Sequence, residues 1–176
     1  MKIHDNMLQG TKSWHDFRTT HFGASEAAAM LGLSKYTTRN ELLQLKKTGI
    51  SKEVDAATQA RFDKGHEVEA LARVIMEKNM GEALSPVTCS DGKISCSCDG
   101  LNFDGDVAWE HKLFNKALFD SVMNNFLPDE YQPQCQQVLM ITGAEKLIFT
   151  VSDGTSENMI SMGVKPDIYR AFYFVR

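Results

Sequence analysis

The chain has 176 residues, of which 43% are hydrophobic and 24% are charged, and its formal net charge is −4. These values are typical of one soluble globular domain with a sizeable core, and they exclude a disordered or low-complexity chain. The charge neither supports nor excludes a DNA partner. No apolar run has the length of a membrane span and the first residues lack a signal-peptide core, so we expect a cytoplasmic protein without a membrane partner.

Helices are expected along the first half of the chain, over residues 13–19, 25–32, 38–49 and 56–80. Ser25 has the residue type and the position of an N-cap, and Thr38 with Glu41 has the spacing of a capping box. Glycines stand where three of these helices should end, at positions 32, 49 and 81.

Strands and helices share the second half of the chain. Alternation and turn residues predict strands over 84–90, 93–98, 107–113, 146–152 and 158–164. Helices are expected over 116–126, 132–142 and 167–176. This order of elements predicts an α/β fold, with a central mixed β-sheet flanked by helices, as a single domain over residues 1–176.

Two neighbouring predicted strands carry the residues that point most clearly to chemistry. Alternation puts Ser97 and Asp99 on one face of the first strand, and Glu110 and Lys112 on one face of the second, with His111 opposite. Two carboxylates and an amine that converge can hold hard cations and place a charged donor beside a phosphate. The alternative is a surface salt bridge in a hairpin.

The long helix contributes a further candidate, Glu69. A solvated pair with Arg73 one turn later would be an ordinary explanation of this residue. Gly65 weakens the same helix by roughly 1 kcal/mol relative to alanine, which invites a packing or functional reason. Close approach of the helix to the sheet is one such reason.

Two more groups of polar residues have both a functional and an ordinary interpretation. Ser25 at a helix N-terminus could hold an anion, and Arg18 could donate a forked pair of hydrogen bonds to a phosphate. An ordinary cap and a surface arginine would look the same. Gln134, Gln136 and Gln137 could line a site, or could form the polar side of an amphipathic helix.

The cysteines, at positions 89, 96, 98 and 135, have neither a zinc spacing nor the density of a disulfide framework. Cys96 and Cys98 are expected to be small buried residues of a strand. A metal clip, or an iron–sulfur nuclease that needs all four thiols to converge, is the alternative.

Several segments together resemble the phage lambda exonuclease family, the YqaJ-type viral recombination nucleases of the PD-(D/E)XK superfamily. Each segment is a weak signal alone, but their order and spacing are specific. The chain after Asp153 matches no motif of the family. The segments are Trp14-His15 to Arg18, Ala24-Ser25-Glu26, Gly65-His66-Glu67-Val68-Glu69, Ser97-Cys98-Asp99-Gly100, Glu110-His111-Lys112 and Tyr131 to Gly143.

This resemblance implies a restriction-endonuclease-like core and a Mg²⁺-dependent 5′→3′ exonuclease. Such an enzyme degrades one strand of linear duplex DNA to mononucleotides and leaves 3′ single-stranded tails for recombination by strand annealing. The resemblance also implies a homotrimer that acts on linear double-stranded DNA ends, and a single-strand annealing protein as its partner. The protein would belong to a phage or prophage and act in the cytoplasm of a bacterial host.

Residue roles follow from the same resemblance. Asp99 and Glu110, with the backbone carbonyl of His111, would bind two Mg²⁺ ions, for which Mn²⁺ can substitute. Glu69 would support the metal site, and Glu67 competes with it for this role. The implied catalytic set is Glu69, Asp99, Glu110 and Lys112.

Lys112 would orient or activate the attacking water and stabilise the charge that develops on the phosphate. The 5′-phosphate of the DNA end would be held by Arg18, Ser25, Ser97 and Gln136.

A DNA-binding module without catalysis is the alternative from another functional class. Residues 25–34 and the capped helix from Thr38 resemble a helix-turn-helix. Arg39 and Asn40 could reach base edges, but the leucines that follow them are typical of a core. The sequence therefore favours the nuclease.

Overall fold

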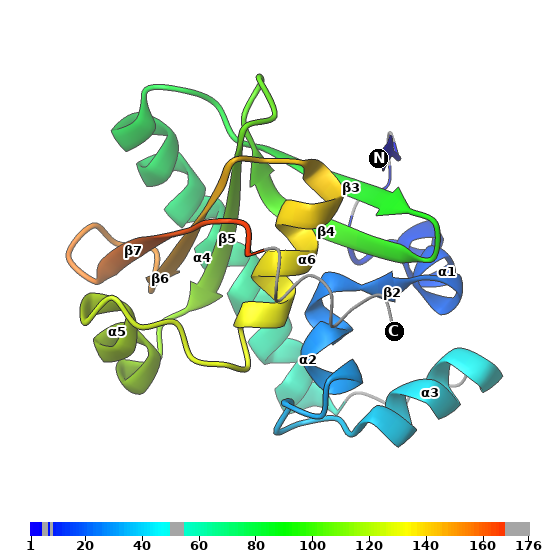
Figure 1. The fold of residues 1–176 in the computed structure, drawn as a ribbon. Coiled ribbons are helices and arrows are strands. Elements are labelled where there is room, and N and C mark those ends of the chain that lie inside the picture. Colours follow the sequence, from blue (N-terminus) through cyan, green and yellow to red (C-terminus); the bar gives the residue numbers. More distant parts are fainter. Residues whose placement is uncertain (5–6, 8, 50–54, 168–176) are drawn as a thin grey trace.

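In the part of the chain that the structure describes, seven strands form one mixed sheet (Figure 1). This computed structural model describes residues 1–4, 7, 9–49 and 55–167. The strand order is β1-β3-β4-β5-β6-β7, and β2 pairs with β4. β5 runs parallel to β6, β2 runs parallel to β4, and the other neighbours are antiparallel. The strands are β1 Lys2–Ile3, β2 Phe22–Gly23, β3 Ser85–Asp91, β4 Ile94–Leu101, β5 Val107–Leu113, β6 Lys146–Ser152 and β7 Met159–Val164.

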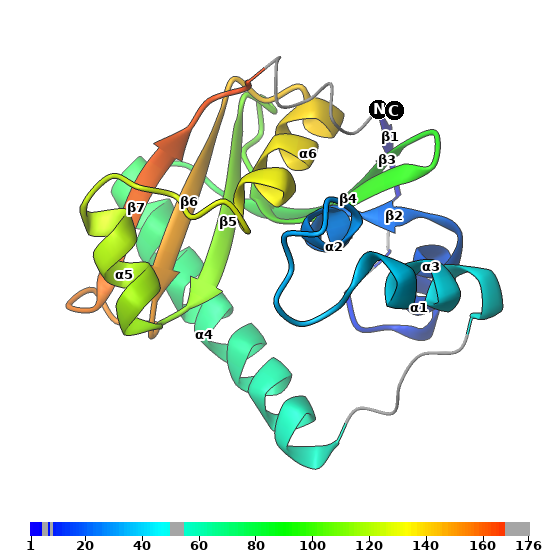
Figure 2. The ribbon, with the colours of Figure 1, turned by 60° about the horizontal axis from the view of Figure 1, so that its bottom comes forward.

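Helices cover both faces of this sheet (Figures 1 and 2). The long helix α4 lies on one face, and α5 and α6 lie on the other. The predicted mixed sheet flanked by helices is therefore confirmed. The helices are α1 Lys12–Thr20, α2 Ala27–Met30, α3 Arg39–Thr48, α4 Ala56–Met80, α5 Lys116–Met123 and α6 Gln132–Thr142, and a 3₁₀ turn, η1, covers Ala24–Glu26.

Most predicted boundaries agree with these elements because local signals set them. Thr38 and Glu41 form the predicted capping box of α3, and Gly49 and Gly81 end α3 and α4 in the left-handed conformation. The strands β1 and β2 were not predicted, since two residues are too few to show a periodicity. The helix expected over 167–176 lies outside the described residues, apart from position 167.

The prediction that Ser25 is an N-cap is wrong. Ser25 lies inside the turn η1, whose N-cap position is Gly23. The Glu26 carboxylate accepts the Gly23 N–H at 2.8 Å, so the capping contact comes from the residue after the serine. The helix α2 that follows has four residues, which is too short for the first helix of a helix-turn-helix.

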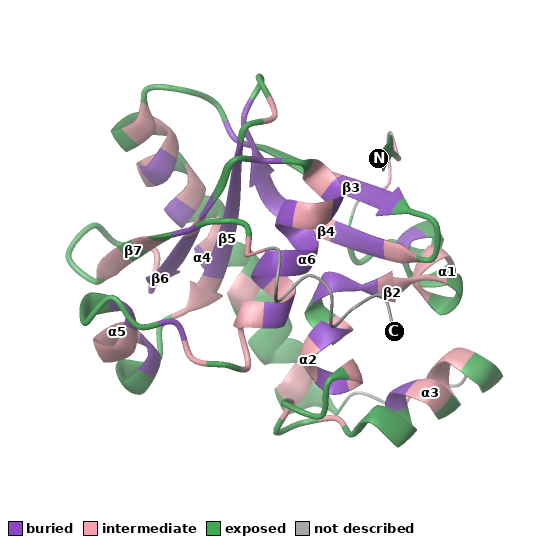
Figure 3. Ribbon diagram, in the orientation of Figure 1, coloured by how far each residue is buried: buried purple, intermediate pink, exposed green. Residues whose placement is uncertain are grey.

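The apolar core has a layer on each side of the sheet. The larger layer lies between the sheet and α5 and α6, and includes Val138 and Phe149. The smaller layer joins α4 to the sheet through Ala72, Met76 and Trp109. Figure 3 shows the central strands and α6 buried, whereas α3 and the first turns of α4 are largely exposed. None of the described helices is long and apolar enough to cross a membrane.

Gly100 of β4 permits the close packing of this smaller layer. A Cβ atom on Gly100 would lie 2.9 Å from the Leu84 Cβ and 3.3 Å from Cε3 of Trp109. We expect Gly100→Ala to lower the free energy of unfolding by about 1–3 kcal/mol, the cost of overpacking a filled core. Gly163→Ala in β7 is the matched control, because nothing lies within 4 Å of its Cβ position. Equal denaturation midpoints for the two variants would contradict this packing.

Candidate active site

Asp99 and Glu110 lie where two central strands separate. The strands β4 and β5 pair at Gly100 with Trp109 and at Leu101 with Ala108. Beyond these pairs, the Asp99 carboxylate takes the place of a strand partner and accepts the His111 N–H at 2.8 Å. Asp99 is 8% exposed and Glu110 is 2% exposed, and Glu110 is close enough to raise the pKa of Asp99. The structure therefore brings the two predicted acids together in a buried site.

Glu110 has one oxygen that is fully engaged and one that is not. Its Oε1 accepts a hydrogen bond from Lys112 Nζ at 2.7 Å and a second one from Gln134 Nε2. Its Oε2 is buried and has no hydrogen-bond partner among the described residues. A buried carboxylate oxygen without a partner is costly, and a bound cation would satisfy it.

Glu69 of α4 approaches the same carboxylates from the other face of the sheet. Its side chain is 16% exposed and is paired with Arg73, so the partner that the ordinary interpretation expected is present, but the pair is largely buried and not solvated. It is nevertheless close enough to raise the pKa of Asp99. Glu67 instead points to solvent, where it pairs with Lys64 at 3.0 Å. The geometry therefore favours Glu69 over Glu67 as the helix residue of the site.

The charges of the cluster act strongly on one another. Burial raises the pKa of Asp99 well above its ordinary value, and the carboxylates of Glu110 and Glu69 raise it further. Burial opposes the charged form of Lys112, but Glu110 and Asp99 hold its pKa above the ordinary value. Burial, helped by the charge of Lys112, lowers the pKa of His111 to about 4, so its imidazole is neutral at pH 7.

The oxygen atoms of this site fit a hard divalent cation. Carboxylate and carbonyl oxygens are the ligands that Mg²⁺ prefers, and Asp99 and Glu110 carry more negative charge than Lys112 balances. Across the described residues, no three His, Cys, Asp or Glu side chains form a ready-made metal site. A metal held by Asp99 and Glu110 would need a further ligand such as the His111 carbonyl.

The cysteines belong to the core. All four are free and buried, and Cys96 and Cys98 are 1% and 2% exposed. This burial confirms the expectation for the two strand cysteines.

The structure connects three of the four predicted phosphate-binding residues. The Arg18 guanidinium lies 4.6 Å from the centre of the Trp14 ring, and its Nη2 donates to Ser25 Oγ at 3.3 Å. The Trp14 Nε1–H donates to Ser97 Oγ at 2.8 Å. Arg18, Ser25 and Ser97 therefore form one group around Trp14, two positions along β4 from Asp99.

Gln136 does not join this group. It is 4% exposed, its Nε2 donates to the Lys165 carbonyl at 3.0 Å, and its Oε1 accepts the Asp167 N–H at 2.8 Å. The glutamine that reaches the acidic site is Gln134, which donates to Glu110. Helix spacing could not choose between them, because α6 is buried on most sides and has no exposed polar face.

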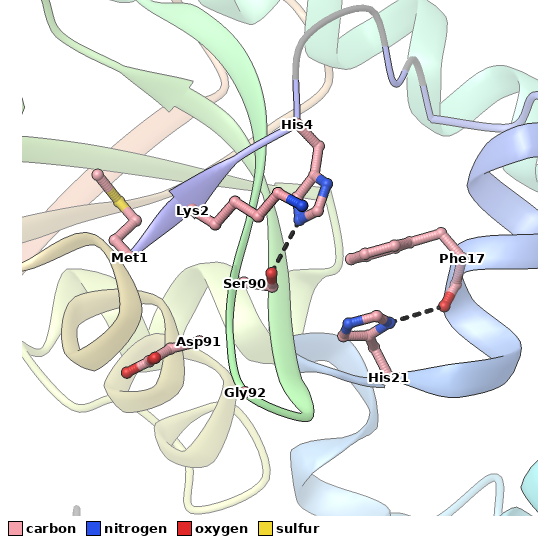
Figure 4. A pocket seen from close by; sticks show the side chains of 8 residues that line it. All are labelled: Met1, Lys2, His4, Phe17, His21, Ser90, Asp91 and Gly92. Atoms are coloured by element: carbon pink, nitrogen blue, oxygen red, sulfur yellow. Dashed lines mark hydrogen bonds between the residues drawn. The ribbon is translucent and has the colours of Figure 1, made fainter.

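A cavity of about 450 Å³ lies elsewhere, between the N-terminal strand, the end of α1 and the β3–β4 turn (Figure 4). His4 is hydrogen-bonded to Ser90 at 2.8 Å across this cavity, and His21 is hydrogen-bonded to the Phe17 carbonyl at 3.1 Å. None of the predicted site residues lines it. The chemistry is therefore expected at the carboxylates.

Comparisons with known proteins agree with the fold and the motifs. The family model described as a YqaJ-like viral recombinase domain matches residues 13–145. An alkaline exonuclease, LHK-Exo from Laribacter hongkongensis, is 22% identical with a TM-score of 0.73, covering 94% of this chain and 91% of its own. The structure of LHK-Exo in complex with dAMP is 21% identical with a TM-score of 0.77, and the match covers 94% of this chain and 87% of that chain.

A phage-related exonuclease from Haemophilus somnus 129PT has a TM-score of 0.59 at 13% identity, covering 89% of each chain. These likenesses show a shared fold. No curated protein matches the chain. The family match covers most of the sequence and includes both strand motifs, so the chain belongs to the YqaJ-like viral recombinase domain family.

Proposed function

We propose that this protein is a Mg²⁺-dependent 5′→3′ exonuclease that degrades one strand of linear duplex DNA to mononucleotides. The observation that carries the proposal is the buried pair Asp99 and Glu110, with Lys112 bonded to Glu110 and the Glu110 Oε2 left without a partner. Family membership supports a nuclease of viral recombination. The complex of LHK-Exo with dAMP supports a deoxynucleoside monophosphate as product.

The reaction would be hydrolysis of the phosphodiester between the first two nucleotides of the 5′-ended strand. A water oxygen forms a bond to phosphorus, the bond from phosphorus to the 3′-oxygen breaks, and the 3′-oxygen takes up a proton. The products are a 5′-mononucleotide and a strand with a new 5′-phosphate. Metal held by Asp99 and Glu110 would supply Lewis-acid polarisation of the phosphate and a more acidic water.

The residues of the chain would then have separate tasks. Lys112 would orient the water and stabilise the charge that develops on the phosphate oxygens. Glu110 holds the Lys112 ammonium, and Gln134 holds the same carboxylate oxygen from α6. Arg73 holds Glu69 against the cluster.

The group of Arg18, Ser25 and Ser97 would bind the terminal 5′-phosphate. Arg18 supplies a full positive charge, and a planar guanidinium can donate two hydrogen bonds to one phosphate. Each cut creates a new 5′-phosphate, so such a pocket would favour repeated cleavage along one strand.

Arg18→Ala tests this pocket. A hydrogen bond to a charged group contributes roughly 1.5–3 kcal/mol, so we expect the preference for 5′-phosphorylated over 5′-hydroxyl ends to fall about tenfold or more. The measurement is kcat/KM on linear duplexes that differ in that one end group, with and without Mg²⁺. Arg39→Ala, at the start of α3, is the control and should keep the preference. An unchanged preference in Arg18→Ala would remove this arginine from the pocket.

Assembly and partners are proposed on family membership alone. We propose a homotrimer around duplex DNA. A single-strand annealing protein would receive the 3′ tail.

A further inference from the structure

Arg18 is part of a cluster of charges that extends beyond the proposed phosphate pocket. Its Nη2 lies 2.7 Å from Glu26 Oε1, and the other oxygen of Glu26 lies 2.7 Å from Lys46 Nζ. The side chains of Arg18, Glu26 and Lys46 are 25%, 13% and 10% exposed. Ion pairs this far from solvent are weakly screened, so each charge constrains the others.

The N–H donors of Lys46 are all used within the protein. Its ammonium group donates to the Arg18 carbonyl at 2.6 Å, to the His21 carbonyl at 2.7 Å and to the Glu26 carboxylate. An ammonium group has three N–H donors, and these acceptors account for all of them. Lys46 therefore balances the charge of Glu26 and has no donor left for DNA.

Arg18 is held differently, because only one end of its guanidinium is used. Nη2 donates to Glu26 and Ser25, whereas Nε and Nη1 donate to no group within the described ranges. The flat face of the guanidinium lies on Trp14, whose own N–H is fixed on Ser97. Arg18, Glu26 and Lys46 together thus carry one net positive charge. Arg18 is the member of the cluster that still has free N–H donors.

We propose that Glu26 and Lys46 are positioning residues that hold Arg18 for the terminal 5′-phosphate, an inference that rests on the proposed function. Glu26 fixes the direction of the guanidinium, and Lys46 cancels the charge of Glu26 so that Arg18 keeps its attraction for a phosphate. A side chain fixed before binding loses less conformational freedom on binding. Neither residue needs to touch DNA.

Glu26→Gln is the informative substitution, because the amide oxygen can still accept the Gly23 N–H and preserve the turn η1. Without the carboxylate, the charge of Lys46 repels the guanidinium and the ion pair that orients it is lost. We expect the ratio of kcat/KM for 5′-phosphorylated over 5′-hydroxyl ends to fall about tenfold, the equivalent of one charge-assisted hydrogen bond. The loss should appear in KM, with kcat within about twofold of the unmodified protein.

Two further variants test the same inference, one at Lys46 and one as a control on α1. Lys46→Met leaves Glu26 bound to Arg18 alone, so the remaining pair is neutral and the same ratio of kcat/KM values should decrease. This variant tests the inference even if Glu26→Gln does not fold. Asp16→Asn on α1 removes an exposed pair with Lys12, at 2.6 Å, and should leave the ratio unchanged. Unchanged cleavage of 5′-hydroxyl ends in each variant would show that the catalytic carboxylates are intact.

The outcomes separate this inference from the proposed function. A ratio that stays constant or rises in both Glu26→Gln and Lys46→Met, while Arg18→Ala lowers it, would overturn the positioning role and leave the phosphate pocket standing. A protein that cleaves DNA without any preference for a 5′-phosphate would overturn both the pocket and the inference. A protein without nuclease activity would refute the proposed function itself.

Discussion

Replacing Asp99 with asparagine is expected to abolish DNA cleavage without unfolding the protein. A metal ion contributes several kcal/mol of charge stabilisation in the transition state, which corresponds to a loss of about 10³-fold or more in kcat. The asparagine can still accept the His111 N–H that Asp99 accepts at 2.8 Å, so the contact between β4 and β5 should remain. Single-turnover cleavage of a linear duplex at saturating enzyme measures this loss.

Stability measurements should separate loss of metal from loss of fold. Burial and two neighbouring carboxylates raise the pKa of Asp99 in the folded protein. Without metal, stability is therefore lost as the pH rises from about 4, where the unfolded carboxyl ionises, to the higher pKa of Asp99 in the folded protein. Asparagine cannot ionise, so in EDTA at pH 8 the melting temperature of Asp99→Asn should equal or exceed that of the unmodified protein. Mg²⁺ at a hundred times its Kd should add about 2.7 kcal/mol to the unmodified protein and little to the variant.

Glu67→Gln is the control for this experiment, because Glu67 is exposed and paired with Lys64. It should keep both its activity and its response to Mg²⁺. Cleavage at the normal rate by Asp99→Asn, or equal stabilisation of both proteins by Mg²⁺, would contradict a metal site at Asp99.

Lys112→Ala should lower kcat by about 10²-fold or more, the scale of losing one preorganised charge donor in a transition state. The ammonium group is held by Glu110 at 2.7 Å, and its pKa lies above the ordinary value, so it is charged at the pH of the reaction. The expected effect is on the chemical step, so the Kd for DNA in Ca²⁺ should change little.

Lys116→Ala is the comparison for Lys112. Lys116 stands four positions later in the chain and pairs on the exposed side of α5 with Asp120 at 2.6 Å. Its removal should leave kcat and DNA affinity unchanged. If Lys112→Ala weakens DNA binding strongly and cleaves at the normal rate with saturating DNA, then Lys112 anchors the phosphate and does not assist the reaction.

Local signals explain how much of this molecule could be predicted from its sequence. Capping residues and glycines act within one turn of the chain, so the ends of α3 and α4 were predicted correctly. Alternation along β5 also placed Glu110 and Lys112 on one face, and the structure joins them by a hydrogen bond.

The remaining features depend on packing between distant segments. Glu67 and Glu69 are alike in sequence, and only the position of α4 over β5 separates an exposed acid from a site acid. Gln134 and Gln136 are distinguished by which of them faces β5 on a helix that is buried on most sides. The contact from Glu26 to Lys46 joins two segments that the sequence does not relate.

The order in which labels are released from a linear duplex tests the central claim most directly. A duplex with a 5′-phosphate at each end carries one label on the 5′-terminal nucleotide and another on the 3′-terminal nucleotide of the same strand. In Mg²⁺, the 5′ label should appear at once as a mononucleotide and the 3′ label should remain in long strands, and EDTA should stop both. Release of the 3′ label first, or release of either label in EDTA, would contradict a metal-dependent 5′→3′ exonuclease.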